Sequence, residues 1–192
     1  MKRIGAKWKP TKTLSRMTRA EMQALDDEHE GDFIAIPIDG AFCFGRFLPK
    51  SGFAFYELRA KTVPPLEEIE KSPILFILSV SFEAMTSGRW RMIGNKPLDK
   101  MLSTPVKYFR NPRGTGYVDI YVDGKFQPYA GEDLTKMERL TAWSPKTVES
   151  RLRCHFIGSI DDQTEHSKIP SESAVKLRRE YFERQAALNA KK

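Results

Sequence analysis

The chain has 192 residues, of which 40% are hydrophobic and 30% charged, and its formal net charge is +7. This length suits one main folded domain that needs no disulfide. No stretch approaches the roughly 20 apolar residues of a membrane helix, and no apolar run follows the basic residues at the N-terminus as it would in a secretory signal. We therefore expect a soluble, cytoplasmic protein in which Cys43 and Cys154 stay reduced.

The basic charge is concentrated at the two ends of the sequence. Met1–Arg19 holds seven lysines and arginines and no acid, and 172–192 has a net charge of +3, whereas 30–171 has a net charge of only +1. Basic tails can bind nucleic acid or an acidic partner, or they can simply be solvated. We favour solvated tails.

The N-terminal part, residues 1–29, is predicted to be a basic extension that contains one short helix. Thr18 and Glu21 are spaced as in a capping box, in which each side chain bonds the other residue's backbone amide. Met22 and Leu25 would form the apolar face of the helix that follows.

The middle of the sequence is rich in predicted strands, which occupy 33–38, 42–48, 53–58, 74–80, 89–93, 106–109, 117–122 and 125–127. Asp39-Gly40 and Asp123-Gly124 are strong signals for two-residue hairpin turns. Pro37 lacks a backbone donor, so it should lie at an edge or a bulge, and Gly45 indicates a bend or a close backbone approach. The continuous apolar run 74–80 predicts a central strand covered on both faces.

Helical segments are predicted between and after the strands. Pro64-Pro65 opens a helical turn over 66–71, and 97–102 is expected to form another. Ser144-Pro145 starts a helix that ends at Gly158. Residues 159–171 read as a linker, and 172–192 as a C-terminal amphipathic helix.

These elements predict an α+β fold that is mainly β over 30–158. We expect a curved antiparallel sheet or a partly open small barrel, with short peripheral helices and a C-terminal helix. The helix at 145–157 should cover one open end or face. The predicted core residues are Trp90, Trp143, Phe76, Leu75, Ile36 and Leu152.

Enzyme signatures are mostly absent, so we predict no catalytic, cofactor or metal site and no enzymatic activity. His29 lies in the acidic stretch 26–32, which could hold calcium or form a solvated connection, and we favour the connection. Cys154 and His155 are neighbours on a predicted helix and would point about 100° apart. This orientation does not suit a thiolate–imidazole pair, so His155 is more consistent with a structural role.

The tripeptide Arg89-Trp90-Arg91 allows two interpretations. The arginines could contact phosphate while Trp90 stacks on a base, which would make the protein a nucleic-acid-binding or regulatory module. Alternatively, Trp90 is a core anchor flanked by surface arginines, and this is the interpretation we favour.

Glu67, Glu68 and Glu70 form an acidic face on the predicted helical turn at 66–71. They could be a solvated face that complements the helix dipole, or a contact patch for a basic protein partner together with exposed aromatics such as Tyr56.

Several segments, in the same order, resemble the immunity protein 26 family of bacterial polymorphic-toxin immunity proteins. They are Gly31–Pro37, Phe44–Leu48, Ser72–Phe76, Thr86–Trp90, Ile93–Asn95, Pro97-Leu98, and Trp143–Pro145 with Glu149, Arg151, Leu152, Arg153 and His155.

The resemblance implies a mainly β protein that binds and neutralises a cognate toxin encoded nearby, often a nuclease of the HNH or endonuclease VII class. Our own hypothesis is stoichiometric occlusion of the toxin by a preformed surface, without a cofactor, and the acidic face and Tyr56 are our candidate toxin contacts. Residues 1–30 and 170–192 lie outside the resemblance. The net positive charge is also unlike the acidic inhibitors expected to fill a nuclease's basic cleft.

Overall fold

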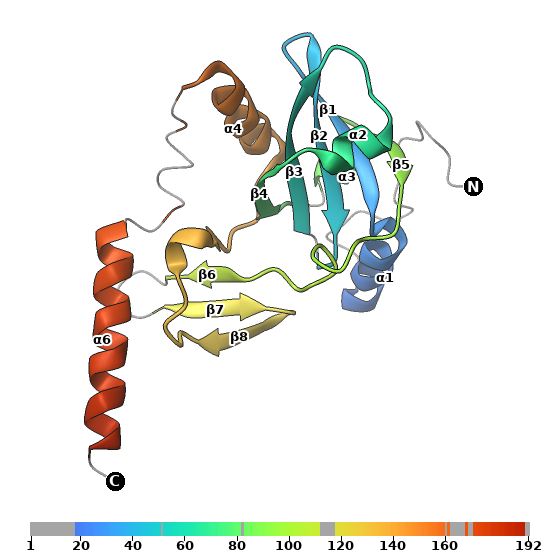
Figure 1. Ribbon diagram of the computed structural model, residues 1–192. Coiled ribbons are helices and arrows are strands. Elements are labelled where there is room, and N and C mark those ends of the chain that lie inside the picture. The colour runs from blue at the N-terminus through green and yellow to red at the C-terminus, as the bar shows by residue number, and fades with distance from the viewer. Residues whose placement is uncertain are drawn as a thin grey trace. The chain divides into compact units, whose positions relative to one another are not determined.

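The computed structural model describes residues 18–50, 52–81, 83–111, 118–159, 161, 168 and 171–190 (Figure 1). Its helices and strands are α1 Arg19–His29, β1 Asp32–Ile38, β2 Ala41–Leu48, β3 Gly52–Ala60, α2 Leu66–Lys71, β4 Ile74–Ser79, α3 Glu83–Thr86, β5 Arg91–Asn95, β6 Tyr108–Arg110, β7 Asp119–Val122, β8 Lys125–Pro128, the 3-10 helix η2 Leu134–Lys136, β9 Glu138–Arg139, α4 Pro145–Ile157 and α6 Ser171–Asn189. Among the described residues, none of the helices has the length and apolar character needed to cross a membrane.

Some expectations concern parts of the chain that lie outside this description. These are the basic residues 1–17, the side chains of Met22 and Leu25, the loop 112–117, and most of the predicted linker 159–171.

Contacts within the chain group it into two compact units, each built from two segments. Unit 1 comprises Met1–Pro105 and Thr141–Asp161, and unit 2 comprises Val106–Leu140 and Asp162–Lys192. The predicted region 30–158 is therefore distributed over both units, and each unit is described by itself.

Unit 1 is built on an antiparallel sheet of five strands in the order β4-β3-β2-β1-β5. The sheet does not close into a barrel, so the structure contains the open antiparallel sheet that was one of the two predicted forms. The fold is α+β, as predicted from the sequence.

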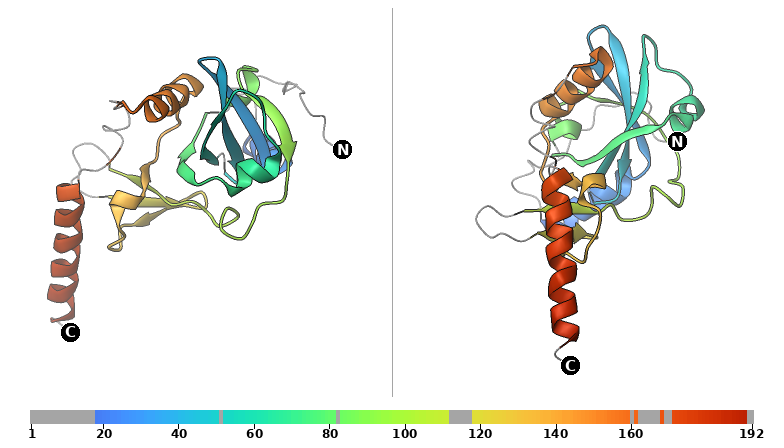
Figure 2. Two further views of the ribbon diagram at one scale, coloured as in Figure 1. Left: turned by 45° about the horizontal axis from the view of Figure 1, so that its top comes forward. Right: turned by 60° about the vertical axis from the view of Figure 1, so that its left-hand side comes forward.

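Both faces of this sheet are covered. Successive side chains of a strand point to opposite faces, so neighbouring residues that are both buried show that each face packs against something. On β1, Ile34 and Ile36 join a cluster that includes Val148 and Leu152 of α4. Phe33, the residue before Ile34, joins a second cluster that includes Ile69 of α2. The right-hand view of Figure 2 shows α4 and α2 on opposite sides of the sheet.

The predicted core residues all belong to the cluster beneath α4. Trp90, Trp143, Ile36 and Leu152 are buried, and Leu75 and Phe76 are partly buried and pack against them. The core prediction is therefore confirmed.

Both Asp-Gly turns form as predicted. Asp39 and Gly40 have φ angles of 48° and 74°, and Asp123 and Gly124 have 49° and 78°. Positive φ at both central residues defines the type I′ turn, whose twist matches that of the flanking strands. Pro37 lies beyond the part of β1 that pairs with β5, so its missing donor breaks no ladder bond on that side.

Gly45 lies where the backbones approach closely. The pairing of β2 with β3 shifts register between Cys43 and Gly45, and a Cβ added at Gly45 would lie 3.0 Å from the carbonyl oxygen of Ala54. The expectation of a bend or close approach is confirmed.

The position predicted for the apolar run 74–80 was wrong, because β4 is an edge strand. Its side chains are apolar on both faces because the sheet is covered on both faces even at its edge. The C-terminal end of the run does have a partner on its outer side. Val80 forms a parallel bridge with Trp143, whose backbone amide donates to the carbonyl oxygen of Ser79 at 2.9 Å. The pattern of apolar residues along a strand indicates which of its faces are covered, but it does not indicate the position of the strand in the sheet.

The predicted caps are present on two helices. Thr18 and Glu21 form the capping box of α1. In α4, Ser144 accepts from the backbone amide of Thr147, and Gly158 ends the helix in the left-handed conformation with φ 71°. One helical turn was expected at 97–102. The structure has no helix there, but the backbone amide of Ser103 donates to the carbonyl oxygen of Asp99 at 3.0 Å, which makes a single turn of the α-helical type.

Unit 2 has a smaller, mixed sheet in the order β8-β7-β6-β9. Phe109, Val118, Ile120 and Leu134 form its core, and Leu177 of α6 packs against them. The C-terminal helix predicted from the sequence thus covers part of this small core through one face.

Gly31, between α1 and β1, lies so close to the backbone of Lys96 that a side chain at this position should clash with it. Gly31 and Gly40 both have positive φ, but a Cβ at Gly31 would lie 2.2 Å from the carbonyl oxygen of Lys96, whereas Gly40 has no atom within 4 Å. We expect Gly31→Ala to lower the free energy of unfolding by about 3 kcal/mol and Gly40→Ala by about 1 kcal/mol. Urea denaturation measures both values, and equal losses would contradict the clash.

Candidate protein-binding surface

The face of unit 1 that carries α2 is organised around one buried cation. Arg46 of β2 is fully buried, and its Nη1 donates to Glu70 Oε1 at 3.0 Å. Its Nη2 donates to the carbonyl oxygens of Lys96 and Pro97 at 2.9 and 2.8 Å. The guanidinium lies over the ring of Phe33, 4.5 Å from its centroid. These contacts tie α2 and the segment after β5 to the same point of the sheet.

Glu70 is shared between two cations. Lys96 Nζ forms an ion pair with Glu70 and lies 3.5 Å from Glu67 Oε1. The hydrogen bond from Lys96, aided by the charges of Lys96 and Arg46, holds the pKa of the Glu70 carboxyl below its usual value. The same contact raises the pKa of the Lys96 ammonium. Glu70 is therefore an ionised anchor of α2.

The predicted acidic face divides into an exposed part and an anchoring part. Glu67 and Glu68 are exposed, with 65% of the Glu67 side chain accessible, whereas only 29% of the Glu70 side chain is. Among the described residues, Glu68 has no ion-pair partner. The surface that α2 offers to another protein is therefore carried by Glu67 and Glu68, which we call the α2 acidic patch.

The expectation that Tyr56 is exposed was wrong, because only 1% of it is accessible. Tyr56 stacks on Phe33 with ring centroids 6.3 Å apart and lies in the cluster that contains Ile69 of α2. It belongs to β3, an inner strand whose two faces are both covered, so Phe55 and Tyr56 are both buried although they are neighbours in sequence.

A second charged network lies on the α4 side of unit 1. Glu149 of α4 accepts from Arg89 Nε and Nη2 at 3.0 and 2.5 Å and from Trp90 Nε1 at 3.1 Å. The Trp90 ring packs edge-on against Phe53 and Phe55. The interpretation favoured from the sequence, a core tryptophan beside an ion-paired arginine, agrees with this geometry.

This arrangement removes the proposed base-stacking group from the surface. Trp90 is 6% exposed and its indole N–H is already bonded to Glu149. Arg91 remains exposed, with its guanidinium 5.9 Å from the centroid of the Phe42 ring. Arg89 is exposed too, but it is ion-paired with Glu149, and with Trp90 buried the two arginines do not make the aromatic and basic platform that single-stranded nucleic acid needs.

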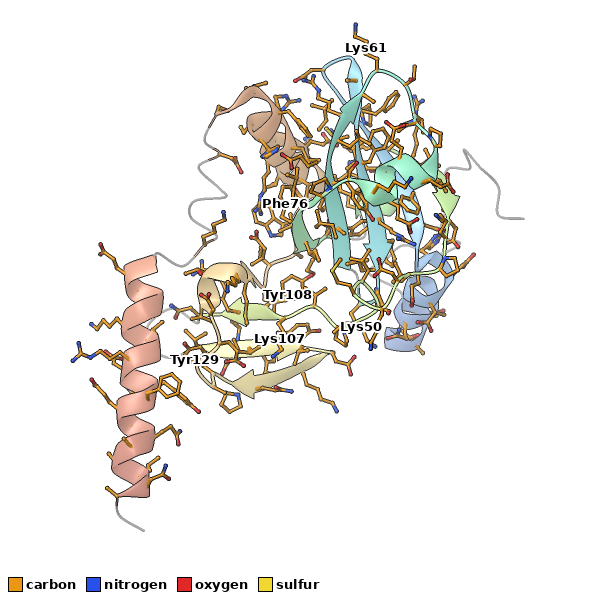
Figure 3. All side chains as sticks on the ribbon, viewed as in Figure 1. Lys50, Lys61, Phe76, Lys107, Tyr108 and Tyr129 are labelled. Atoms are coloured by element: carbon orange, nitrogen blue, oxygen red, sulfur yellow. The ribbon has the colours of Figure 1, made fainter. Side chains whose placement is uncertain are left out.

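Arg151 of α4 holds the edge strand on the same side. Its guanidinium lies 4.0 Å from the centroid of the Phe76 ring and 5.3 Å from that of Trp143. Figure 3 labels Phe76 on β4, in the part of unit 1 that α4 covers. The cation thus joins α4, β4 and the segment before α4 through two aromatic faces.

His29 and Asp32 were not expected to be buried, since the stretch 26–32 read as a solvated connection. Their side chains are 7% and 0% exposed, and His29 Nδ1 lies 2.7 Å from Asp32 Oδ2. Asn95 donates to Asp32 Oδ1 at 2.7 Å and to the carbonyl oxygen of Glu30 at 2.8 Å. The acidic stretch therefore ends in a polar cluster that joins α1 to β1 and β5.

The remaining candidate chemical groups lie apart from one another. Burial raises the pKa of the Cys43 thiol to about 11, which keeps it protonated near neutral pH. His155 lies 3.6 Å from Glu57 on the surface. The described part of the chain holds no group of three or more His, Cys, Asp or Glu side chains placed to bind a metal ion.

Comparison with protein families gives a match over part of the chain. Residues 29–118, a little under half of the chain, match the model of the family described as Immunity protein 26. This segment contains β1 to β6 and therefore the whole five-stranded sheet, α2, Arg46 and the α2 acidic patch. Neither the curated proteins nor the solved structures give a match.

Arg46 should be the most costly of the charged side chains to remove. We expect Arg46→Ala to lower the free energy of unfolding by about 3 kcal/mol or more, because Glu70 and two carbonyl oxygens lose a buried donor. Arg153, whose exposed side chain pairs with Asp39 at 2.8 Å, is the matched control, and Arg153→Ala should cost about 0.5 kcal/mol. Similar losses in the two variants would refute the anchoring role of Arg46.

Glu70 should make stability depend on pH in the acid range. Its folded-state pKa lies below its usual value of 4.5, so its contribution is complete above that pH and is lost as the pH falls through the lower folded-state value. Urea unfolding of the unmodified protein and Glu70→Gln should differ by a constant amount from about pH 7 to about pH 5, and the gap should shrink below about pH 4.5. A gap that stays constant as the pH falls below about 4.5 would contradict this assignment.

Proposed function

Because residues 29–118 match the model of the Immunity protein 26 family, we propose that the chain protects its cell by binding a cognate bacterial toxin and occluding it in a stoichiometric complex. The family match supports an immunity function, and the finer steps that follow are our inference. The observation that carries them is the location of the α2 acidic patch within the matched segment.

The hydrogen bonds that hold α2 and α4 to the sheet of unit 1 support a mechanism that uses a preformed surface. Arg46 fixes α2 through Glu70, and Glu149 fixes Arg89 and Trp90 on the other face. A surface that is already ordered loses little conformational entropy when it binds, so more of the contact energy appears as affinity. A standard interface would bury about 1,600 Å² in total, which is more than α2 alone can supply. Neighbouring parts of unit 1 would therefore contribute.

The α2 acidic patch supports a basic partner. Glu67 and Glu68 are both exposed on α2; Glu70 pairs with Arg46, and Lys96 pairs with Glu70 and lies 3.5 Å from Glu67. Negative charge at this point would speed the approach of a basic toxin surface, such as that of a nuclease, although the whole chain is positive. Electrostatic complementarity needs only the local field at the contact, so the net charge does not oppose the proposal.

Co-expression with the product of the adjacent toxin gene tests the function. We expect a one-to-one complex and survival of cells that otherwise die from the toxin. The absence of both a complex and rescue would reject the immunity function for this toxin.

A charge-reversal pair tests the α2 acidic patch separately. Glu67→Lys with Glu68→Lys should weaken toxin binding by about tenfold or more, chiefly through slower association, and the difference should decrease at high salt. Glu172→Lys with Glu183→Lys makes the same charge change on exposed positions of α6 and should leave binding unchanged. Surface plasmon resonance gives both rate constants. Equal affinity of the two double variants would reject the patch but not the immunity function.

A further inference from the structure

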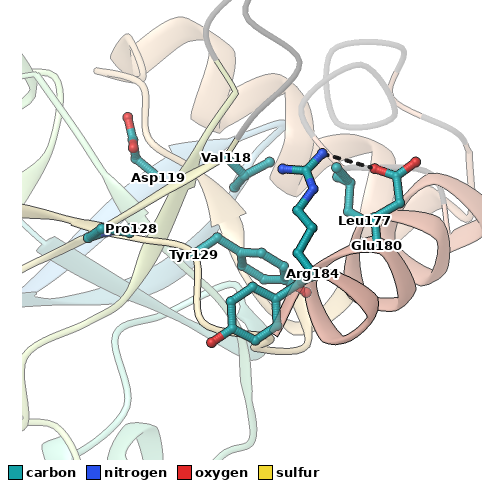
Figure 4. Close-up of a pocket in the computed structure, with 8 residues that line it drawn as sticks. Val118, Asp119, Pro128, Tyr129, Leu177, Glu180 and Arg184 are labelled. Atoms are coloured by element: carbon teal, nitrogen blue, oxygen red, sulfur yellow. Dashed lines mark ion pairs between the residues drawn. The ribbon is translucent and has the colours of Figure 1, made fainter. Parts of the chain in front are cut away.

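Unit 2 contains a pocket between α6 and the β7–β8 hairpin, with a volume of about 290 Å³ (Figure 4). Val118 and Pro128 line it from the sheet side, and Leu177 lines it from α6. Its remaining apolar lining comes from Tyr129 and Tyr181, whose ring centroids are 5.7 Å apart with an angle of 68° between the planes. The pocket thus presents an apolar floor together with the edge and face of two aromatic rings.

One cation of the lining remains accessible to a ligand. Arg184 is 74% exposed, and its Nη2 lies 4.0 Å from Glu180 Oε2, a distance too long for a hydrogen bond. Figure 4 shows its side chain beside Val118, above the ring of Tyr129. A guanidinium in this position can lie against the face of an aromatic ring and still donate to a carbonyl oxygen.

The acidic groups of the lining do not favour a charged ligand. Asp119 accepts from Arg110 Nε at 3.2 Å and from Nη2 at 2.5 Å, so its charge is already compensated. Glu180 lies 4.0 Å from both Lys176 and Arg184. Arg110 compensates Asp119 and Lys176 lies near Glu180, so with Arg184 the site has a net charge of only +1, which disfavours a cationic ligand and leaves shape and ring contacts to hold an uncharged aromatic group.

We propose that this pocket binds an aromatic side chain, tryptophan in particular, presented by a segment of a partner protein. Sites for drug-sized ligands measure about 300–1,000 Å³, so a pocket at the lower limit suits one large side chain. Tyrosine and arginine around an apolar floor are the residue types that dominate the strongest contacts in protein interfaces. The site does not depend on the proposed toxin contact, because apart from Val118 its lining lies beyond the family-matched residues 29–118.

A titration of the full chain with N-acetyl-L-tryptophanamide, a neutral probe that carries the side chain between two amide groups, tests the proposal. Amide resonances of Val118, Tyr129 and Leu177 should shift and reach saturation in nitrogen–proton NMR spectra. N-acetyl-L-leucinamide, which is apolar but has no ring, should bind at least about fivefold more weakly, since it lacks the contacts with Tyr181 and Arg184.

Two arginines of α6 offer a matched pair of variants. Arg184→Gln should raise the dissociation constant of the tryptophan probe about threefold, the factor expected for an exposed cation–π contact. Arg179, which pairs with Glu183 at 2.8 Å and does not line the pocket, is the control, and Arg179→Gln should leave the constant unchanged. The proposal is overturned if no saturable shift occurs at these amides, if the leucine probe binds equally well, or if the two variants behave alike.

Discussion

The buried guanidinium of Arg46 is the interaction on which the α2 face of unit 1 depends. An unpaired charge inside a protein costs several kcal/mol, and here the cost is offset by hydrogen bonds to Glu70 and to two carbonyl oxygens and by the face of Phe33. The bonds have fixed directions, so they select one position for α2 and one path for the segment after β5. Hydrophobic packing of Ile69 alone would permit small shifts that these directional bonds do not.

A second directional network performs the same role on the opposite face. Glu149 receives three hydrogen bonds from Arg89 and Trp90, and the indole among these donors belongs to the core. The sheet is therefore held between two helices, each fixed by a charged group as well as by apolar contacts. Such a framework can present the same surface before and after a partner arrives, which suits an inhibitor that acts by occupation of a site.

Local patterns in the sequence predicted much of the fold. The Asp-Gly dipeptides specify their turns through residues that tolerate positive φ, and the Thr18 and Glu21 spacing specifies a capping box. Strand order, in contrast, depends on which strands pair, so the apolar run of β4 did not reveal an edge. Tyr56 was misplaced for a related reason: whether a strand is inner and covered on both faces is not visible in its own residues.

The anchoring role of Arg46 could not be read from the sequence, because its partners lie 24, 50 and 51 positions away. Arginine is rarely buried, and neither β2 nor α2 alone signals the bond between them. The cluster of His29, Asp32 and Asn95 shows the same difficulty. An acidic stretch usually indicates solvent, and only the pairing of β1 with β5 brings Asn95 to Asp32.

The way in which unit 1 is assembled from two stretches of chain has a consequence for its biosynthesis. During translation Trp90 is synthesised well before Glu149, and the strands β6 to β9 of unit 2 are synthesised between them. Until α4 emerges, the indole N–H and the apolar face that α4 covers have no partner from that helix. A nascent chain that ends at the boundary of the family match would thus expose this face, so chaperone dependence should be greatest during that interval of translation.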